Sequence, residues 1–397
     1  MRIRSARFAL ATVVFAVLLA QVLLYPGIDT LVAALGAETA LNASMWFLAT
    51  EFAAFVLFAG VWGALSDAAG RRVPFIVAGA LAGAVGYVLL AVLPQALRLP
   101  FVAVLGLRAL QGAATIGAFS LSITMLMDLD GGHGRNMGAA GIAIGGGTAL
   151  GAPLGGQLYE LDPFAPLFAA AALLVVVGAL AALVEDRAPS DRGGRLGAVR
   201  DTIRGTPEIV VPCAFGFVDR LTAGFFALVG TLYFRQAFAL SPGQTGLMLA
   251  LFFAPFALFQ YPFGVLSDRI GRTIPVLAGS TLYGLAVIGV GFAPTVLMAG
   301  AAMVGVGVIG ALMAPATMAL VTDLAPDAER GVAMAAFNAF GSLGFLAGVL
   351  VGGTVADEVG YLAAFLTVGG LEVAVATLAI PAFLRLGLTD LDSRVPE

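Results

Sequence analysis

The segment GALSDAAGRRVP at residues 63–74 recurs as GVLSDRIGRTIP at 264–275, and seven of the twelve positions are identical. Two shorter features recur in the same order, an Asp…Arg spacing and a glycine-rich hexapeptide. They are Asp128 with Arg135 and Asp323 with Arg330, then GAPLGG at 151–156 and GVLVGG at 348–353. The three offsets are 201, 195 and 197 residues. Ordered repeats at nearly one offset indicate that the chain consists of two related halves.

The composition is that of an integral membrane protein. Hydrophobic residues make up 60% of the chain and charged residues only 11%, whereas a soluble domain is roughly one quarter charged. A soluble chain this apolar would expose large apolar patches and aggregate, and a lipid bilayer removes that problem. The net charge of −4, without a basic run, argues against a nucleic-acid partner, and the single cysteine, Cys213, excludes an internal disulfide.

Twelve segments are long and apolar enough to cross a bilayer as helices, which takes about 20 residues each. The spans expected in the first half are 8–32, 43–65, 74–93, 100–126, 137–158 and 165–184. Those expected in the second half are 208–234, 243–265, 274–293, 295–321, 331–355 and 361–384. The polar segment 188–207 is predicted to be a cytoplasmic linker between six-helix bundles at 1–187 and 208–397. The predicted fold class is therefore all-α, an integral membrane protein with twelve transmembrane helices in two bundles related by a parallel repeat.

The placement of arginine predicts the orientation of the chain. All 20 basic residues are arginine, and with the N-terminus inside, sixteen of them fall in inner loops and tails. Only Arg98 and Arg235 fall in outer loops. This bias follows the rule that positively charged loops stay in the cytoplasm. We therefore expect both termini in the cytoplasm. The minimal loops of the chain favour a location in the plasma membrane of a prokaryote.

The repeated loop resembles the most diagnostic motif of the major facilitator superfamily, and the resemblance covers essentially the whole chain. The matching residues are Gly63, Asp67, Gly70, Arg71 and Arg72, then Gly264, Asp268, Arg269, Gly271 and Arg272. Alanine at position 68 departs from the family pattern, which has arginine there. The resemblance implies a transporter in which these loops form a cytoplasmic gate. The same gate would include Asp128, Arg135, Asp323 and Arg330. A plain turn with arginines as topology anchors is the alternative interpretation.

Two further segments resemble motifs of that superfamily. RALQGAAT at 108–115 is similar to the helix 4 motif frequent in proton-coupled members, and GTALGAPLGG at 147–156 is similar to the helix 5 motif associated with antiporters. The second match is imperfect, because its proline stands one position late. The residues concerned on helices 5 and 11 are Gly147, Gly151, Pro153, Gly155, Gly156, Gly348, Gly352 and Gly353. Close helix packing at small residues would explain the same pattern.

Ionisable residues inside apolar spans usually face a cavity and mark function. Those on helices that the family resemblance places around the central cavity are Asp29, Arg108 with Gln111, Asp219 and Arg220. Glu51 on the second span is either close to this cavity or interfacial, and Glu372 on the last span receives no functional assignment. Our hypothesis is that Asp29, together with Glu51, binds the coupling proton and that Arg108 responds to its charge. A buried ion pair that only fixes helix register is the alternative.

The predicted function is proton-coupled export of small lipophilic compounds by alternating access. Gln260, Tyr261 and Asn338 are polar groups in apolar runs that would contact substrate or bond a backbone carbonyl. A proton-coupled uptake symporter and a lipid flippase remain alternatives, since fold does not fix substrate. The sequence has no HExxH or GxSxG motif, so it does not suggest an enzyme, a metal site or a cofactor. The expected partners are a small-molecule substrate, protons and the bilayer, and the expected oligomeric state is a monomer.

Overall fold

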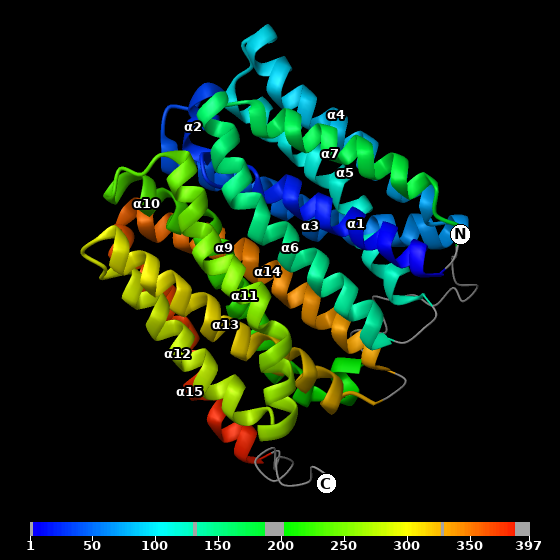
Figure 1. The fold of residues 1–397 in the computed structure, drawn as a ribbon, viewed down its shortest axis with the longest axis vertical. Helices are drawn as coiled ribbons and strands as arrows, with labels where there is room; N and C mark the ends of the chain where they lie inside the picture. Colours follow the sequence, from blue (N-terminus) through cyan, green and yellow to red (C-terminus); the bar gives the residue numbers. More distant parts are fainter. Residues whose placement is uncertain (1–2, 130–132, 187–201, 327–328, 386–397) are drawn as a thin grey trace. The chain divides into compact units, whose positions relative to one another are not determined.

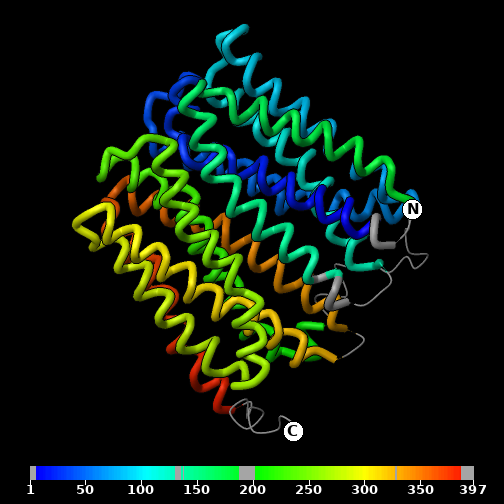
Figure 2. Tube along the Cα trace, viewed as in Figure 1, coloured from blue at the N-terminus to red at the C-terminus, as the bar shows by residue number. Residues whose placement is uncertain are grey.

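The computed structural model describes residues 3–129, 133–186, 202–326 and 329–385, and over these ranges the regular structure is helical (Figure 1, Figure 2). The chain packs as two compact units. The first comprises Met1–Arg192 together with Phe234–Ala250, and the second comprises Gly193–Tyr233 together with Leu251–Glu397. The repeat in the sequence places 234–250 in the second half, whereas its packing assigns it to the first unit. The division into bundles at 1–187 and 208–397 stays a prediction.

The first unit contains the helices of the N-terminal half. These are α1 (Ile3–Val22), α2 (Ile28–Ala34), α3 (Ala40–Ala69), α4 (Val73–Leu97), α5 (Phe101–Met127), α6 (His133–Leu161) and α7 (Ala165–Ala182). Within this unit α4 packs against both α5 and α7, and α1 packs against α6. The segment from the second half adds the part of α10 (Thr231–Ala237) that begins at Phe234 and the first turns of α11 (Pro242–Ile270). The α3–α4 turn closes at Gly70, whose φ of 63° is a left-handed conformation that glycine adopts without strain.

The second unit contains the rest of α11 and the remaining helices. These are the 3₁₀ turn η1 (Pro207–Ile209), α9 (Val210–Phe225), the π-helical segment η2 (Phe226–Gly230), α12 (Thr273–Gly291), α13 (Val296–Leu324), α14 (Arg330–Glu358) and α15 (Tyr361–Arg385). Here α9 packs against α14, and α12 packs against α13 and α15. The α11–α12 turn closes at Gly271, again with positive φ, so the repeated loop has the same backbone device in both units.

Ten helices of the described residues are long and apolar enough to cross a membrane. They are α3, α4, α5, α7, the continuous span Pro207–Ala237, and α11 to α15. Two predicted spans fall outside this group, since α1 contributes only the shorter apolar helix Ala6–Val22 and α6 is rich in glycine. The predicted segments 137–158 and 331–355 are nevertheless helical throughout, in α6 and α14. Packing against neighbours therefore outweighs the cost of glycine in a helix interior.

The first predicted span, 8–32, is wrong as a single helix. α1 ends at Val22 and α2 begins only at Ile28. Pro26 lies in this break, because it has no N–H to donate and its ring cannot continue the helix. Gly27 beside it leaves room for an aromatic ring, since a Cβ at this position would lie 2.6 Å from Cγ of Tyr159. The break redirects α2, which carries Asp29.

The span predicted at 208–234 is also irregular. It passes from α9 into the π-helical segment η2, whose five residues are all buried, and then into α10. A π-turn leaves carbonyl groups to be satisfied in another way, and here the hydroxyl of Thr231 donates to the carbonyls of Phe226 and Ala227, both at 3.2 Å. Such segments are rare in proteins, and those that do occur often lie at functional sites. Sequence periodicity carries no signal for this switch.

Close helix contacts at glycine repeat in the two units (Figure 1). On α6 the glycines against α1 are Gly147, Gly151 and Gly155, and on α14 those against α9 are Gly344, Gly348 and Gly352. A Cβ at Gly155 would overlap the carbonyl of Leu23, and one at Gly348 would overlap that of Leu221. The interpretation of this pattern as close packing is confirmed for these positions. Gly156 packs on Pro242 at the start of α11, Pro153 lies within α6, and Gly353 is buried on α14.

Candidate functional site

A buried ion pair lies at the centre of the first unit. Glu51 on α3 and Arg108 on α5 are both 0% exposed, and Nη2 of Arg108 lies 2.5 Å from Oε2 of Glu51. Glu51 is therefore enclosed by protein, and its depth in the membrane stays a prediction. The predicted proximity of Arg108 to one of two acids is confirmed for Glu51. Asp29 lies elsewhere, as described below.

Polar and aromatic side chains surround the arginine. Nη1 of Arg108 donates to Oε1 of Gln111 at 2.5 Å, and Nε2 of Gln111 donates to the hydroxyl of Thr115 at 2.7 Å. Because these residues follow each other at spacings of three and four, they share one face of α5. The guanidinium also lies over the ring of Phe47, 4.6 Å from its centroid, and 5.7 Å from that of Tyr87. Such cation–π contacts stabilise a desolvated guanidinium. Gln111, Phe47 and Tyr87 thus contact the guanidinium in addition to Glu51.

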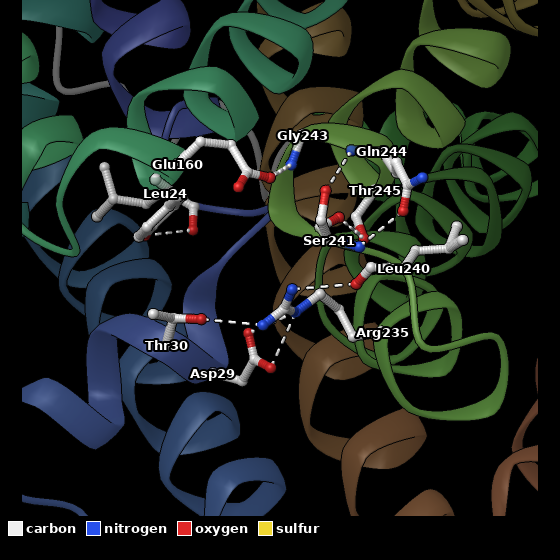
Figure 3. Close-up of polar contacts among 11 residues, drawn as sticks. Leu24, Asp29, Thr30, Glu160, Arg235, Leu240, Ser241, Gly243, Gln244 and Thr245 are labelled. Carbon is white, nitrogen blue, oxygen red and sulfur yellow. Dashed lines mark hydrogen bonds and ion pairs between the residues drawn. The ribbon is translucent and has the colours of Figure 1, made fainter.

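A second polar group, the α2/α10 cluster, consists of Asp29, Thr30, Glu160, Arg235 and Gly243 within the first unit (Figure 3). Nε of Arg235 lies 3.0 Å from both carboxylate oxygens of Asp29, and Nη2 donates to the hydroxyl of Thr30 at 3.0 Å. Oε1 of Glu160 accepts from the backbone N–H of Gly243 at 2.9 Å. The sequence assigned Arg235 only to an outer loop, so its partnership with Asp29 was missed. The segment 234–250 is thereby tied to α2 and α6.

The start of α11 in this cluster has a capping box. The hydroxyl of Ser241 accepts from the N–H of Gln244 at 3.3 Å, while the Gln244 side chain accepts from the N–H of Ser241 at 2.9 Å (Figure 3). This reciprocal arrangement satisfies two N–H groups at a helix start. The Ser-x-x-Gln spacing is readable in the sequence, although its contact with α6 is not.

Removing the charge of Asp29 should loosen segment 234–250. In an Asp29→Asn variant the guanidinium of Arg235 keeps Thr30 and loses its carboxylate, a loss worth about 1 kcal/mol for a pair that is partly exposed. With a reporter thiol in Ser241→Cys, maleimide labelling should then be about five-fold faster, because that energy is a five-fold change in an opening equilibrium. Cys213 is buried, so the background is low.

The matched control for that experiment is Glu38→Gln, which neutralises an exposed acid following α2. We expect no change in labelling in this variant. Equal labelling of Ser241→Cys with and without Asp29→Asn would show that the ion pair does not hold the segment.

The loops between α3 and α4 and between α11 and α12 contain the predicted gate residues. Arg72 is buried and its guanidinium pairs with Asp128, while Asp186 accepts from the backbone N–H of Arg72 at 3.0 Å. In the second unit Arg272 pairs with Asp268 at 2.6 Å and with Asp323 at 3.1 Å. In each unit a loop arginine thus pairs with an acid of the same unit, Asp128 in the first and Asp323 in the second. The two arginines are not repeat equivalents, since Arg272 corresponds to Arg71 in the sequence.

Two acidic side chains compensate the partial burial of Arg272 in the second loop. Burial lowers the pKa of Arg272, and hydrogen bonds and charges from Asp268 and Asp323 outweigh it and raise that pKa. Among the other gate residues, Nε of Arg330 donates to the carbonyl of Thr322 at 3.0 Å, while Arg71 and Arg269 are exposed. The side chain of Arg135 lies outside the described residues.

The remaining predicted site residues do not form one group. Nε of Arg220 lies 4.0 Å from Oδ2 of Asp219, so these neighbours approach each other at the limit of an ion pair. Tyr261 is 81% exposed, and with Gln260 it lines an open cavity of about 280 Å³ beside Asp268 and Arg272. Asn338 is exposed on α14. A shared substrate site of these residues stays a prediction.

Comparison with known proteins adds to this geometry. The family model described as Major Facilitator Superfamily matches residues 10–218 and 212–392. The chain is 30% identical over 250 residues to the class G tetracycline resistance protein of Vibrio anguillarum, over 60% of either chain. It is 25% identical over 290 residues to the synaptic vesicular amine transporter of Rattus norvegicus, over 70% of this chain and 55% of the relative. The chain therefore spans less than two thirds of the length of these relatives.

A solved structure of a D-xylose-proton symporter has the same fold. Its TM-score is 0.77 at 15% identity, and the superposition covers 96% of this chain and 98% of that one. At this identity the likeness concerns the fold alone.

Proposed function

We propose that this chain, which belongs to the major facilitator superfamily, exports small lipophilic compounds in exchange for protons by alternating access. In this proposal α1 with α2, and α6, cross the membrane in addition to the ten apolar helices, which gives twelve crossings. Both termini are cytoplasmic, the membrane is the plasma membrane and the protein works as a monomer. The repeated loops with Arg72 and Arg272 form its cytoplasmic gate.

The Glu51–Arg108 pair carries the proposal. An ion pair that is fully removed from water is expensive to form and is often no more stable than an apolar replacement, so its presence needs a reason. Protonation of Glu51 would cancel its charge, while Gln111, Phe47 and Tyr87 would continue to stabilise the guanidinium. The pair can therefore occupy two states that differ by one proton. A two-state element of this kind is what coupling to a proton gradient requires.

The position of Asp29 changes the assignment of the proton carrier. The sequence favoured Asp29 as the first carboxylate, but its partner is Arg235 and its side chain is partly exposed. We therefore assign the coupling proton to Glu51 and give Asp29 a role in holding segment 234–250. The resemblance to a tetracycline resistance protein supports export of an apolar compound.

The test uses inside-out membrane vesicles acidified by respiration, a pH-sensitive dye, and a panel of tetracycline, lipophilic cations, sugars and amphiphiles. We expect at least one lipophilic compound to release lumenal protons only when the protein is present. Glu51→Gln should abolish this release and still support exchange of labelled substrate across the vesicle membrane, because coupling is lost and binding is kept. Glu358→Gln, which changes an exposed acid at the end of α14, is the matched control and should behave as the unchanged protein.

Three results would contradict this assignment. Proton release that survives in Glu51→Gln and vanishes in Asp29→Asn would return the carrier role to Asp29. Proton movement in the same direction as the substrate would indicate an uptake symporter. A panel that gives no response would exclude drug export as proposed.

A further inference from the structure

Glu372 on α15 is a buried carboxyl group outside the site described above. Its side chain is 0% exposed, and it lies between three helices of the second unit. Oε1 accepts from the hydroxyl of Thr222 on α9 at 3.2 Å, and Oε2 accepts from the hydroxyl of Ser280 on α12 at 2.7 Å. Both oxygens are thus held by hydroxyl groups, which are neutral and can either donate or accept.

The charged and titratable groups around Glu372 do not neutralise an anion. α9 contributes Asp219 and Arg220, α12 contributes Tyr283, and the charged residues of α14 lie only at its ends. Arg220 is 45% exposed on its side chain and lies nearest to Asp219. In the described residues Glu372 has no ion pair within 4.0 Å, whereas Glu51 in the first unit lies 2.5 Å from Arg108.

This difference determines the charge of the two glutamates. Ionising a fully buried carboxyl without a cation loses its hydration and gains no ion pair, so the group instead keeps its proton. A protonated Glu372 donates to one hydroxyl and accepts from the other, which fits both observed contacts. Glu51 has its cation, which favours its ionised form, whereas the surroundings of Glu372 favour its protonated form.

Helix spacing connects Glu372 with a group closer to water. Thr222 and Asp219 are three residues apart on α9 and so lie on the same face. Ser280 and Tyr283 have the same relation on α12, and the Tyr283 hydroxyl is buried without a hydrogen-bond partner in the described part of the chain. A buried polar atom of this kind is a place for an ordered water or a moving proton.

We propose that Glu372 is a second proton-binding site, which holds a proton in this conformation and exchanges it with Asp219 through Thr222. In the exchange, Glu372 passes its proton to the oxygen of Thr222 while Thr222 passes its hydroxyl proton to the carboxylate of Asp219. One proton moves, Thr222 is unchanged, and the negative charge moves from Asp219 to Glu372. The inference needs neither a substrate nor the role assigned to Glu51.

The test is infrared difference spectroscopy of the purified full chain in lipid nanodiscs. At neutral pH we expect the C=O stretch of a protonated carboxyl, which Glu372→Gln should lose and the control Glu358→Gln should retain. A spectrum unchanged by Glu372→Gln would show that Glu372 is ionised and would overturn the proposal. Glutamine has nearly the shape and hydrogen bonding of the protonated acid, so we expect this variant to fold.

The variant Thr222→Val distinguishes a Glu372 that exchanges its proton through Thr222 from a Glu372 that only stabilises the fold. Valine keeps the shape of threonine and removes the hydroxyl, so the C=O band of Glu372 should shift in frequency. In heavy water the carboxyl proton should also exchange for deuterium more than ten-fold more slowly, as followed by the isotope shift of the same band. An unchanged exchange rate would refute the path through Thr222. Thr222→Val also tests the site if Glu372→Gln does not fold. A C=O band whose frequency is unchanged by Thr222→Val does not belong to Glu372. Glu51→Gln should retain the band, so the transport proposal and this one can fail separately.

Discussion

Arg108→Met is expected to lower the free energy of unfolding by about 3–5 kcal/mol, because it leaves the carboxylate of Glu51 buried without its cation. Methionine is flexible and close in length to the aliphatic part of arginine, so little of this cost comes from a cavity. The measurement is the thermal or denaturant unfolding of the protein in detergent or lipid. Arg385→Met, which changes an exposed arginine at the end of α15, should cost no more than about 0.5 kcal/mol.

The double variant Glu51→Gln with Arg108→Met makes the cause of that loss testable. It removes both charges together, so most of the lost stability should return even though the ion pair is gone. Proton-driven transport should not return, since the carboxyl group to which the coupling proton is assigned is gone. If the double variant is as unstable as Arg108→Met alone, the cost comes from lost contacts of the arginine with Gln111, Phe47 and Tyr87 rather than from the buried charge.

The all-helical fold could be predicted because its signals are local. Apolar runs of sufficient length predicted the long helices. Most predicted bounds agree with the observed ones within a few residues, as in α12 and α15. The positive φ at Gly70 and Gly271 follows from a tight turn between two helices. The repeated glycines predicted close helix packing, and the structure shows that α9 is the helix against which those of α14 pack.

The irregular parts depend on contacts that a single sequence does not display. The break around Pro26 had a local signal that a hydropathy reading passes over, since proline within an apolar run need not interrupt a membrane helix. The π-helical segment before Thr231 has no such signal. Pairing of Asp29 with Arg235 joins residues more than two hundred positions apart, and charge alone allows Asp29 several partners. The hydroxyl partners of Glu372 come from α9 and α12, so only packing reveals them.

Gly348→Ala is expected to destabilise the protein by about 3 kcal/mol, whereas Gly289→Ala should stabilise it by roughly 0.5–1 kcal/mol. Both changes replace glycine by alanine in a helix of the second unit, and alanine is the better helix former. At Gly289 a Cβ meets nothing within 4 Å, so the gain in helix propensity is realised. At Gly348 the new Cβ overlaps the carbonyl of Leu221, and α9 and α14 must move apart.

The first unit offers the same comparison independently. Gly155→Ala meets the carbonyl of Leu23, which directly follows α1, while Gly106 on α5 has nothing within 4 Å of the added Cβ. Melting temperatures should therefore fall for Gly155→Ala and rise for Gly106→Ala. Because the glycine contacts recur in both halves of the chain, the two destabilising changes should have similar size and should add when combined, since the sites lie in separate units. If the melting temperature does not fall for Gly155→Ala and Gly348→Ala, the backbones are not in the contact that the structure describes, and these glycines serve another purpose.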